Sequence, residues 1–124
     1  MKKIILCFVI LGQSAFANTN YIGRYELEVN IGGKFFKDYF TVSNISASKK
    51  VTGIFEVPRV FQSSFNGQLN DRFVSGDFIA KERGKEFKVE LLAELLDQCQ
   101  IKGTLLQDKI VFANFVGRKD SCHE

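Results

Sequence analysis

The chain of 124 residues contains no tryptophan, one proline and one histidine. The histidine, His123, stands next to the C-terminus, where a Ser-His-Asp or Cys-His arrangement would have no rigid support. A metal site built on His123 and two cysteines would lack a fourth ligand and the usual ligand spacing. No glycine-rich loop opens a helical pattern, so a phosphate-binding motif is missing. We therefore predict a protein that is not an enzyme and that has no catalytic residues, no metal and no cofactor.

Long apolar runs are also scarce. The one at the N-terminus, Ile4–Leu11, is far shorter than the roughly 20 residues that span a bilayer. Lys2 and Lys3 precede this run and Ala15-Phe16-Ala17 follows it, which is the pattern of a bacterial signal peptide. We predict a leader over residues 1–17, cleaved after Ala17, and a single periplasmic or secreted domain over residues 18–124 without a membrane span.

An excess of charge of one sign is absent from the predicted mature part. Without Lys2 and Lys3, 15 basic residues face 14 acidic ones, so the formal charge falls from +3 to about +1. This near balance removes the main electrostatic argument for binding nucleic acid or an anionic membrane surface. We expect no nucleic-acid partner.

Cysteine is rare, but its number is informative. Cys7 leaves with the predicted leader, so Cys99 and Cys122 remain as a pair. Two cysteines in a small exported domain usually bond to each other because the compartment is oxidising. We predict a Cys99–Cys122 disulfide.

Turn signals are present at regular intervals and divide the mature chain into short segments. Signals that lie roughly 10 to 15 residues apart are typical of all-β sandwiches and barrels. Seven such signals predict eight strands. They are Gly32-Gly33, the stretch 46–49, Pro58, Asn70-Asp71, the stretch 82–85, Asp97-Gln98 and Gln107-Asp108.

The segments between these signals alternate apolar and other residues with a period of two, as half-buried strands do. The stretch Lys88–Gln98 is ambiguous, because its leucine, alanine and glutamate content also suits a helix. We predict a strand there, since the alternation begins at Phe87 and runs unbroken to Leu95.

A short pattern recurs five times, in which a glycine stands between two apolar residues that are each two positions away. In every copy the three residues share one face of the predicted strand. Glycines on the concave face allow strands to coil tightly enough to close a barrel. We predict an all-β, eight-stranded antiparallel meander that forms a small closed barrel. The glycines are Gly23, Gly53, Gly67, Gly76 and Gly103.

An exported eight-stranded meander resembles the calycin group, which comprises lipocalins, avidins and fatty-acid-binding proteins. That group often begins with Gly-x-Trp on the first strand, covered by an Arg or Lys from the last strand. Gly23-Arg24-Tyr25 and Arg118 occupy the corresponding ends of this chain, with tyrosine in place of tryptophan. The resemblance implies that Tyr25 and Arg118 close the barrel floor by cation–π stacking.

Three polar residues interrupt faces that would otherwise be apolar. Asp38, Ser63 and Asn114 are expected to point into the barrel, where a buried polar group needs a partner. They are therefore candidate ligand contacts in a mostly apolar cavity. The abundant phenylalanines could instead fill a solid core, and both interpretations remain open.

Two functions fit this outline. The first is a binding protein for a small apolar ligand held inside the barrel. The second is a periplasmic protein-interaction module, such as a hydrolase inhibitor or an envelope-assembly factor, that acts through loops or an outer face. The candidate interaction loop contains Pro58, Arg59 and Phe61.

Overall fold

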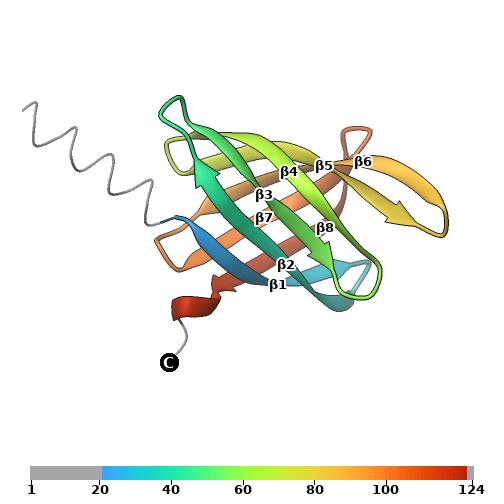
Figure 1. The fold of residues 1–124 in the computed structure, drawn as a ribbon. Helices are drawn as coiled ribbons and strands as arrows, with labels where there is room; N and C mark the ends of the chain where they lie inside the picture. Colours follow the sequence, from blue (N-terminus) through green and yellow to red (C-terminus); the bar gives the residue numbers. More distant parts are fainter. Residues whose placement is uncertain (1–20, 123–124) are drawn as a thin grey trace, which may run out of the picture.

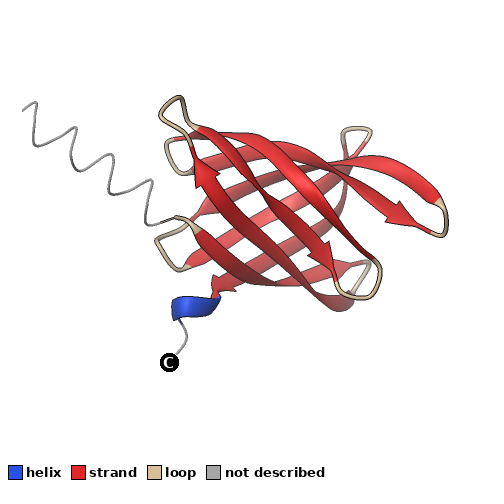
Figure 2. Cartoon of the chain, viewed as in Figure 1, coloured by secondary structure: helices blue, strands red, loops and turns tan. Residues whose placement is uncertain are grey.

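The computed structural model describes residues 21–122 as one β-domain (Figures 1 and 2). The predicted leader, Cys7 and His123 lie outside the described residues. The described chain contains eight strands followed by a 3-10 helix, η1 (Asp120–Cys122), and so confirms the all-β prediction. The strands are β1 (Gly23–Ile31), β2 (Lys34–Ile45), β3 (Lys50–Val57), β4 (Phe61–Asn70), β5 (Phe73–Glu82), β6 (Lys85–Leu95), β7 (Gln100–Gln107) and β8 (Ile110–Lys119).

Each strand pairs in antiparallel fashion with the next one, and β1 pairs with β8 to close the barrel. All seven connections fall at the predicted turn signals. The segment with mixed helix and strand character belongs to β6 as far as Leu95, so the period-two interpretation was correct. No helix in residues 21–122 is long and apolar enough to cross a bilayer.

The barrel has two different ends (Figure 1). At one, which we call the terminal end, the two ends of the described chain lie beside the β2–β3, β4–β5 and β6–β7 turns. At the other, which we call the mouth, the β1–β2, β3–β4, β5–β6 and β7–β8 turns gather. The predicted disulfide joins Cys99 to Cys122 at the terminal end, with their Cα atoms 5.7 Å apart.

The repeated glycines point inward, as predicted. Side chains and the backbone of neighbouring strands occupy the space that a Cβ atom would need at each of them. A Cβ atom added to Gly76 would lie 2.5 Å from Cζ of Phe65, and one added to Gly67 would lie 2.8 Å from the same atom. A Cβ atom on Gly103 would lie 2.7 Å from Cζ of Phe115. The missing side chains therefore leave room for the tips of two phenylalanine rings against the inner wall.

A one-residue irregularity in β8 changes which of its residues face inward. Leu105 of β7 pairs with Ala113 and Leu106 pairs with Val111, so Phe112 is an extra residue in the ladder. Such a bulge shifts the alternation by one position. Beyond it the inward residues carry odd numbers, and they include buried Phe115 and Lys119.

The bulge overturns two predictions. Asn114 was expected inside the barrel but is exposed on the outer face. Arg118 was expected to cover the barrel floor, but it is also exposed, and its guanidinium donates to the backbone oxygen of Cys122 at 3.2 Å. Asn114 was misplaced because the period-two pattern was continued across the extra residue Phe112. Arg118 was assigned to the floor by the resemblance to calycins, and the same bulge turns it to the outer face.

The wall is incomplete near the mouth. The β4–β5 ladder covers only Asn66–Asn70 on β4, and the β6–β7 ladder begins on β6 at Glu90. The distal parts of β5 and β6 therefore pair only with each other and project beyond the barrel as a hairpin (Figure 2). A hydrogen bond spans the gap between β4 and β5. The Ser63 hydroxyl of β4 donates to the backbone oxygen of Ile79 on β5.

Candidate functional site

A cavity of about 410 Å³ opens at the mouth of the barrel. All four hairpins that meet at this end contribute to its wall, so residues far apart in the sequence surround one space. Its volume lies within the range of small-molecule sites. The lining residues are Ile31, Phe36, Lys37, Asp38, Phe55, Val57, Pro58, Val60, Phe61, Phe78, Ala80, Glu82, Phe87, Val89, Leu105 and Phe112.

Aromatic rings form much of this wall. The rings of Phe55 and Phe78 stack with centroids 4.2 Å apart and planes 7° from parallel. The ring of Phe61 lies 6.1 Å from that of Phe78 across the gap between β4 and β5. Sequence analysis had not singled out Phe55, Phe78, Phe87 or Phe112 as site residues, although each belongs to an alternating segment near a turn.

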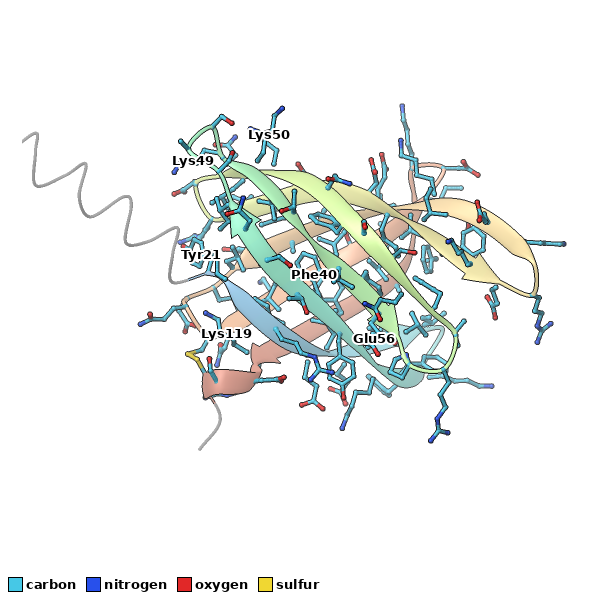
Figure 3. All side chains as sticks on the ribbon, viewed as in Figure 1. Tyr21, Phe40, Lys49, Lys50, Glu56 and Lys119 are labelled. Atoms are coloured by element: carbon cyan, nitrogen blue, oxygen red, sulfur yellow. A yellow bond between two sulfur atoms is a disulfide. The ribbon has the colours of Figure 1, made fainter. Side chains whose placement is uncertain are left out.

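The middle of the barrel is solid. Phe40 and Phe65 are fully buried, with their rings in an edge-to-face contact at 4.9 Å, and neither lines the cavity. Figure 3 shows Phe40 at the centre of the fold. The sequence left open whether the barrel has a filled core or a ligand cavity. The structure has both, because side chains fill the barrel below the mouth and a cavity lies at the mouth.

Asp38 provides a carboxyl group in this apolar cavity. It lies on β2 opposite Leu27 of β1, and only 5% of its surface is exposed, so its predicted inward position is confirmed. Its Oδ1 atom has no hydrogen-bond partner among the described residues. Burial raises the pKa of the Asp38 carboxyl to about 6, because the charged form has lost hydration that no neighbour replaces.

The other candidate residues near the mouth have different roles. Ser63 is partly buried, and its hydrogen bond to the backbone of Ile79 gives it a structural partner. Phe61 turns inward against the core and lines the cavity, together with Pro58. Arg59 is exposed at the tip of the β3–β4 turn, where its φ of 69° lies in the left-handed region. The predicted interaction loop is therefore also part of the cavity rim.

The terminal end is closed by Tyr25 and Lys119. Lys119 is the register partner of Tyr25, and its Nζ atom lies 5.6 Å from the centroid of the Tyr25 ring. The Tyr25 hydroxyl donates to the backbone oxygen of Tyr21 at 2.9 Å. Burial lowers the pKa of the Lys119 amine. The cation that covers the floor is thus the residue after Arg118, and the sequence carries no signal for the bulge that places it there.

Two further hollows lie on the strand faces outside the barrel, and a third lies at the β5–β6 turn beside Arg59 and Val60. One runs over β1, β2, β7 and β8 and includes the exposed rings of Phe35 and Phe36. The other crosses β5 to β8 and includes exposed Phe73 and Leu92. The only buried carboxyl group in the described residues, that of Asp38, faces the mouth cavity and none of these hollows.

Comparison of the chain with protein-family models, with curated proteins and with solved structures finds no match. Among residues 21–122, no group of three or more histidine, cysteine, aspartate or glutamate side chains is placed to hold a metal ion. The proposal below therefore depends on the geometry of the mouth cavity.

Proposed function

We propose that the protein binds a small, largely apolar ligand in the mouth cavity and that it acts as an exported carrier or sensor, without catalysis. The observation that supports this proposal is the aromatic cavity of about 410 Å³ above a solid core. A barrel needs no hollow for stability, since voids reduce packing and cost free energy. A cavity of this size and lining is typical of a ligand site.

We further propose that the chain is a calycin-like protein of the bacterial periplasm or of the extracellular space. Three features support this proposal: the leader pattern in residues 1–17, the Cys99–Cys122 disulfide and the closed eight-stranded meander. A cation from the last strand also covers an aromatic residue of the first one, although it is Lys119 and not Arg118.

The alternative function, a periplasmic protein-interaction module, stays a prediction. Phe61 of the proposed loop points inward, and Arg59 and Val60 remain as its exposed residues. The position of this loop supports the ligand proposal at least as well as the interaction proposal, because the loop forms one side of the cavity rim.

The ligand proposal can be tested by filling the cavity. Ala80 lines the cavity from β5, whereas its neighbour Ile79 belongs to the outer face of the same strand. We expect Ala80→Trp to weaken binding of a neutral apolar probe, such as 1-octanol, at least tenfold. Ile79→Trp is the matched control and should leave the affinity unchanged within about twofold.

Isothermal titration calorimetry provides the affinities, and circular dichroism checks that both variants keep the fold. Mass spectrometry of an organic extract of the purified protein tests for a ligand that has been retained from the host. Failure of the wild-type protein to bind 1-octanol, together with an extract free of small molecules, would overturn the proposal. Equal loss in both variants would place the site elsewhere and would count against the mouth cavity.

A further inference from the structure

We propose that the ligand of the mouth cavity carries a basic nitrogen, which pairs with the carboxylate of Asp38 while the apolar remainder lies among the phenylalanine rings. The ligand class is therefore a small apolar amine. This inference rests on the proposed function, because it specifies the chemistry of the same site.

The first support is the position of Asp38. Its side chain points inward from β2, is 95% buried and has an Oδ1 atom without a hydrogen-bond partner in the described part of the chain. A buried carboxylate without a partner is destabilising, because removal from water costs more than the surrounding groups return. A ligand cation that bonds to this oxygen would supply the missing interaction.

The second support is the distribution of the other charges. Lys37 precedes Asp38 on β2, and its amine already forms an ion pair at 2.9 Å with Glu26 on the outside of β1. Glu82 at the end of β5 is the third ionisable residue of the cavity wall and is also acidic. Glu56, from the neighbouring β3, belongs to the outer face.

The remaining elements contribute no charged residue to the cavity lining. Four exposed basic residues at the same end of the barrel line a separate outer hollow and not this cavity: Arg59, Lys81, Arg83 and Lys85. The lining residues from β3, β4, β6, β7 and β8 are apolar, and so is Ile31, the lining residue from β1. Leu27, which pairs with Asp38 on β1, and the next inward residue, Val29, are apolar as well. A ligand with a carboxylate, such as a fatty acid, would therefore meet two acidic groups and one lysine that is already paired. The cavity is electrostatically suited to a cation.

The third support is the aromatic lining. The faces of aromatic rings attract cations through their quadrupoles, and this attraction grows when the site excludes water. Phe55 and Phe78 line the cavity as a pair of rings stacked on each other, and Phe61, Phe87 and Phe112 add further rings to the wall. A ring-lined cavity with one carboxylate is a suitable environment for an ammonium group that carries an alkyl or aryl tail.

The experiment compares three probes with the same chain length: octylamine, 1-octanol and octanoate. At pH 7.5 octylamine is protonated, as a lysine side chain is. Titration calorimetry on the protein expressed from the full-length sequence should show that octylamine binds at least tenfold more tightly than either of the other two. Asp38→Asn, which keeps the shape of the side chain, should remove this preference while changing the affinity for 1-octanol less than twofold.

Two controls separate a specific pair from general electrostatics. Glu56→Gln removes one carboxylate from the outer face beside the site and should leave the preference for octylamine intact. Lowering the pH from 7.5 to 5 should weaken octylamine binding to the wild-type protein but not 1-octanol binding. The reason is that the pKa of Asp38, raised by burial to about 6, makes its carboxyl neutral at the lower pH.

The outcomes distinguish this inference from the proposed function. Equal affinities for octylamine and 1-octanol, or tighter binding of octanoate, would overturn the amine proposal and leave the apolar site in place. An unchanged preference in Asp38→Asn would overturn it as well. Absence of binding by all three probes would overturn both proposals.

Discussion

The tip of the Phe65 ring lies against Gly76, so that a methyl group at residue 76 would come within 2.5 Å of Cζ of that ring. Phe65 is fully buried and also contacts Phe40 edge to face. The two residues come from adjacent strands, β4 and β5. This contact connects the glycine that permits tight coiling with the aromatic core that fills the barrel.

Gly76→Ala should therefore destabilise the protein by about 1 to 3 kcal/mol, which is the usual cost of forcing an extra methyl group into a packed interior. Urea unfolding, followed by circular dichroism, measures the free energy of unfolding. Ser75→Ala, at an exposed position next to it on β5, is the control and should change the free energy by less than about 0.5 kcal/mol. Equal effects at the two positions would contradict the close packing of Gly76 against the Phe65 ring and the backbone oxygen of Asn66.

A prediction about pH follows from Asp38. In the unfolded chain its carboxyl has a pKa of 3.8, and in the folded protein burial raises this pKa to about 6. Well below pH 3.8 both states are protonated and the group has no effect on stability. As the pH rises from about 4 to above 6, the folded state holds a proton that the unfolded state has lost, so stability falls.

Asp38→Asn removes this loss. At pH 7.5 we expect the variant to be more stable than the wild-type protein by roughly 2 kcal/mol, a value lowered for the access of water to the cavity. At pH 3, below the pKa of both states, the difference should vanish. Urea unfolding at both pH values checks this, with Glu56→Gln as the control. A difference between Asp38→Asn and wild type that does not depend on pH would contradict the raised pKa.

Two substitutions at the floor of the barrel test whether Lys119, and not Arg118, covers Tyr25. Lys119 is 7% exposed and packs over Tyr25, whereas Arg118 is exposed. We expect Lys119→Ala to cost about 1 to 2 kcal/mol, because it removes both the buried stem and the contact of the amine with the ring. Arg118→Ala should cost less than about 0.5 kcal/mol. Chemical denaturation of the two variants checks this, and the reverse order would restore the assignment made from the sequence.

The disulfide should contribute roughly 3 kcal/mol to stability, because it closes a loop with a sequence separation of 23 residues in the unfolded chain. The double variant with Cys99→Ser and Cys122→Ser should lose this amount in urea unfolding. A reducing agent should lower the stability of the wild-type protein to the level of the variant and leave the variant unaffected. Identical unfolding of the oxidised and reduced wild-type protein would contradict the prediction.

Export can be tested by the mass of the protein. We expect the protein recovered from the periplasm or culture medium of a bacterial host to begin at Asn18, because Ala15 and Ala17 supply the small residues that signal peptidase accepts. Intact-mass spectrometry locates the new N-terminus. Ala17→Arg is a variant that should block this cleavage. A wild-type protein that remains in the cytoplasm with residues 1–17 attached would contradict the prediction.

The candidate site was predictable only in part. Asp38 was recognised because it interrupts an apolar alternation, and that alternation holds along β2 from Asp38 to Val42. Asn114 was misplaced because no particular residue type marks the bulge in the sequence, although the bulge reverses the facing of every residue that follows it. Arg118 was assigned to the floor by the calycin resemblance, which does not show the bulge either. The cavity itself was not predictable, because its volume depends on how far the β5–β6 hairpin diverges from β4.

Local properties of the sequence were sufficient to predict the strands, the seven turns and the inward glycines, because alternation and turn chemistry depend on residues that are close together in the chain. The cysteine pair was predictable because only two cysteines follow the predicted leader. Tertiary structure decided which cation covers Tyr25 and where the barrel is hollow. It also decided that Asp38 faces that hollow, with an Oδ1 atom that has no hydrogen-bond partner within residues 21–122. These features depend on strand register and on contacts between distant hairpins. A one-residue change in register turns every following side chain to the opposite face without any change in the local pattern of the sequence.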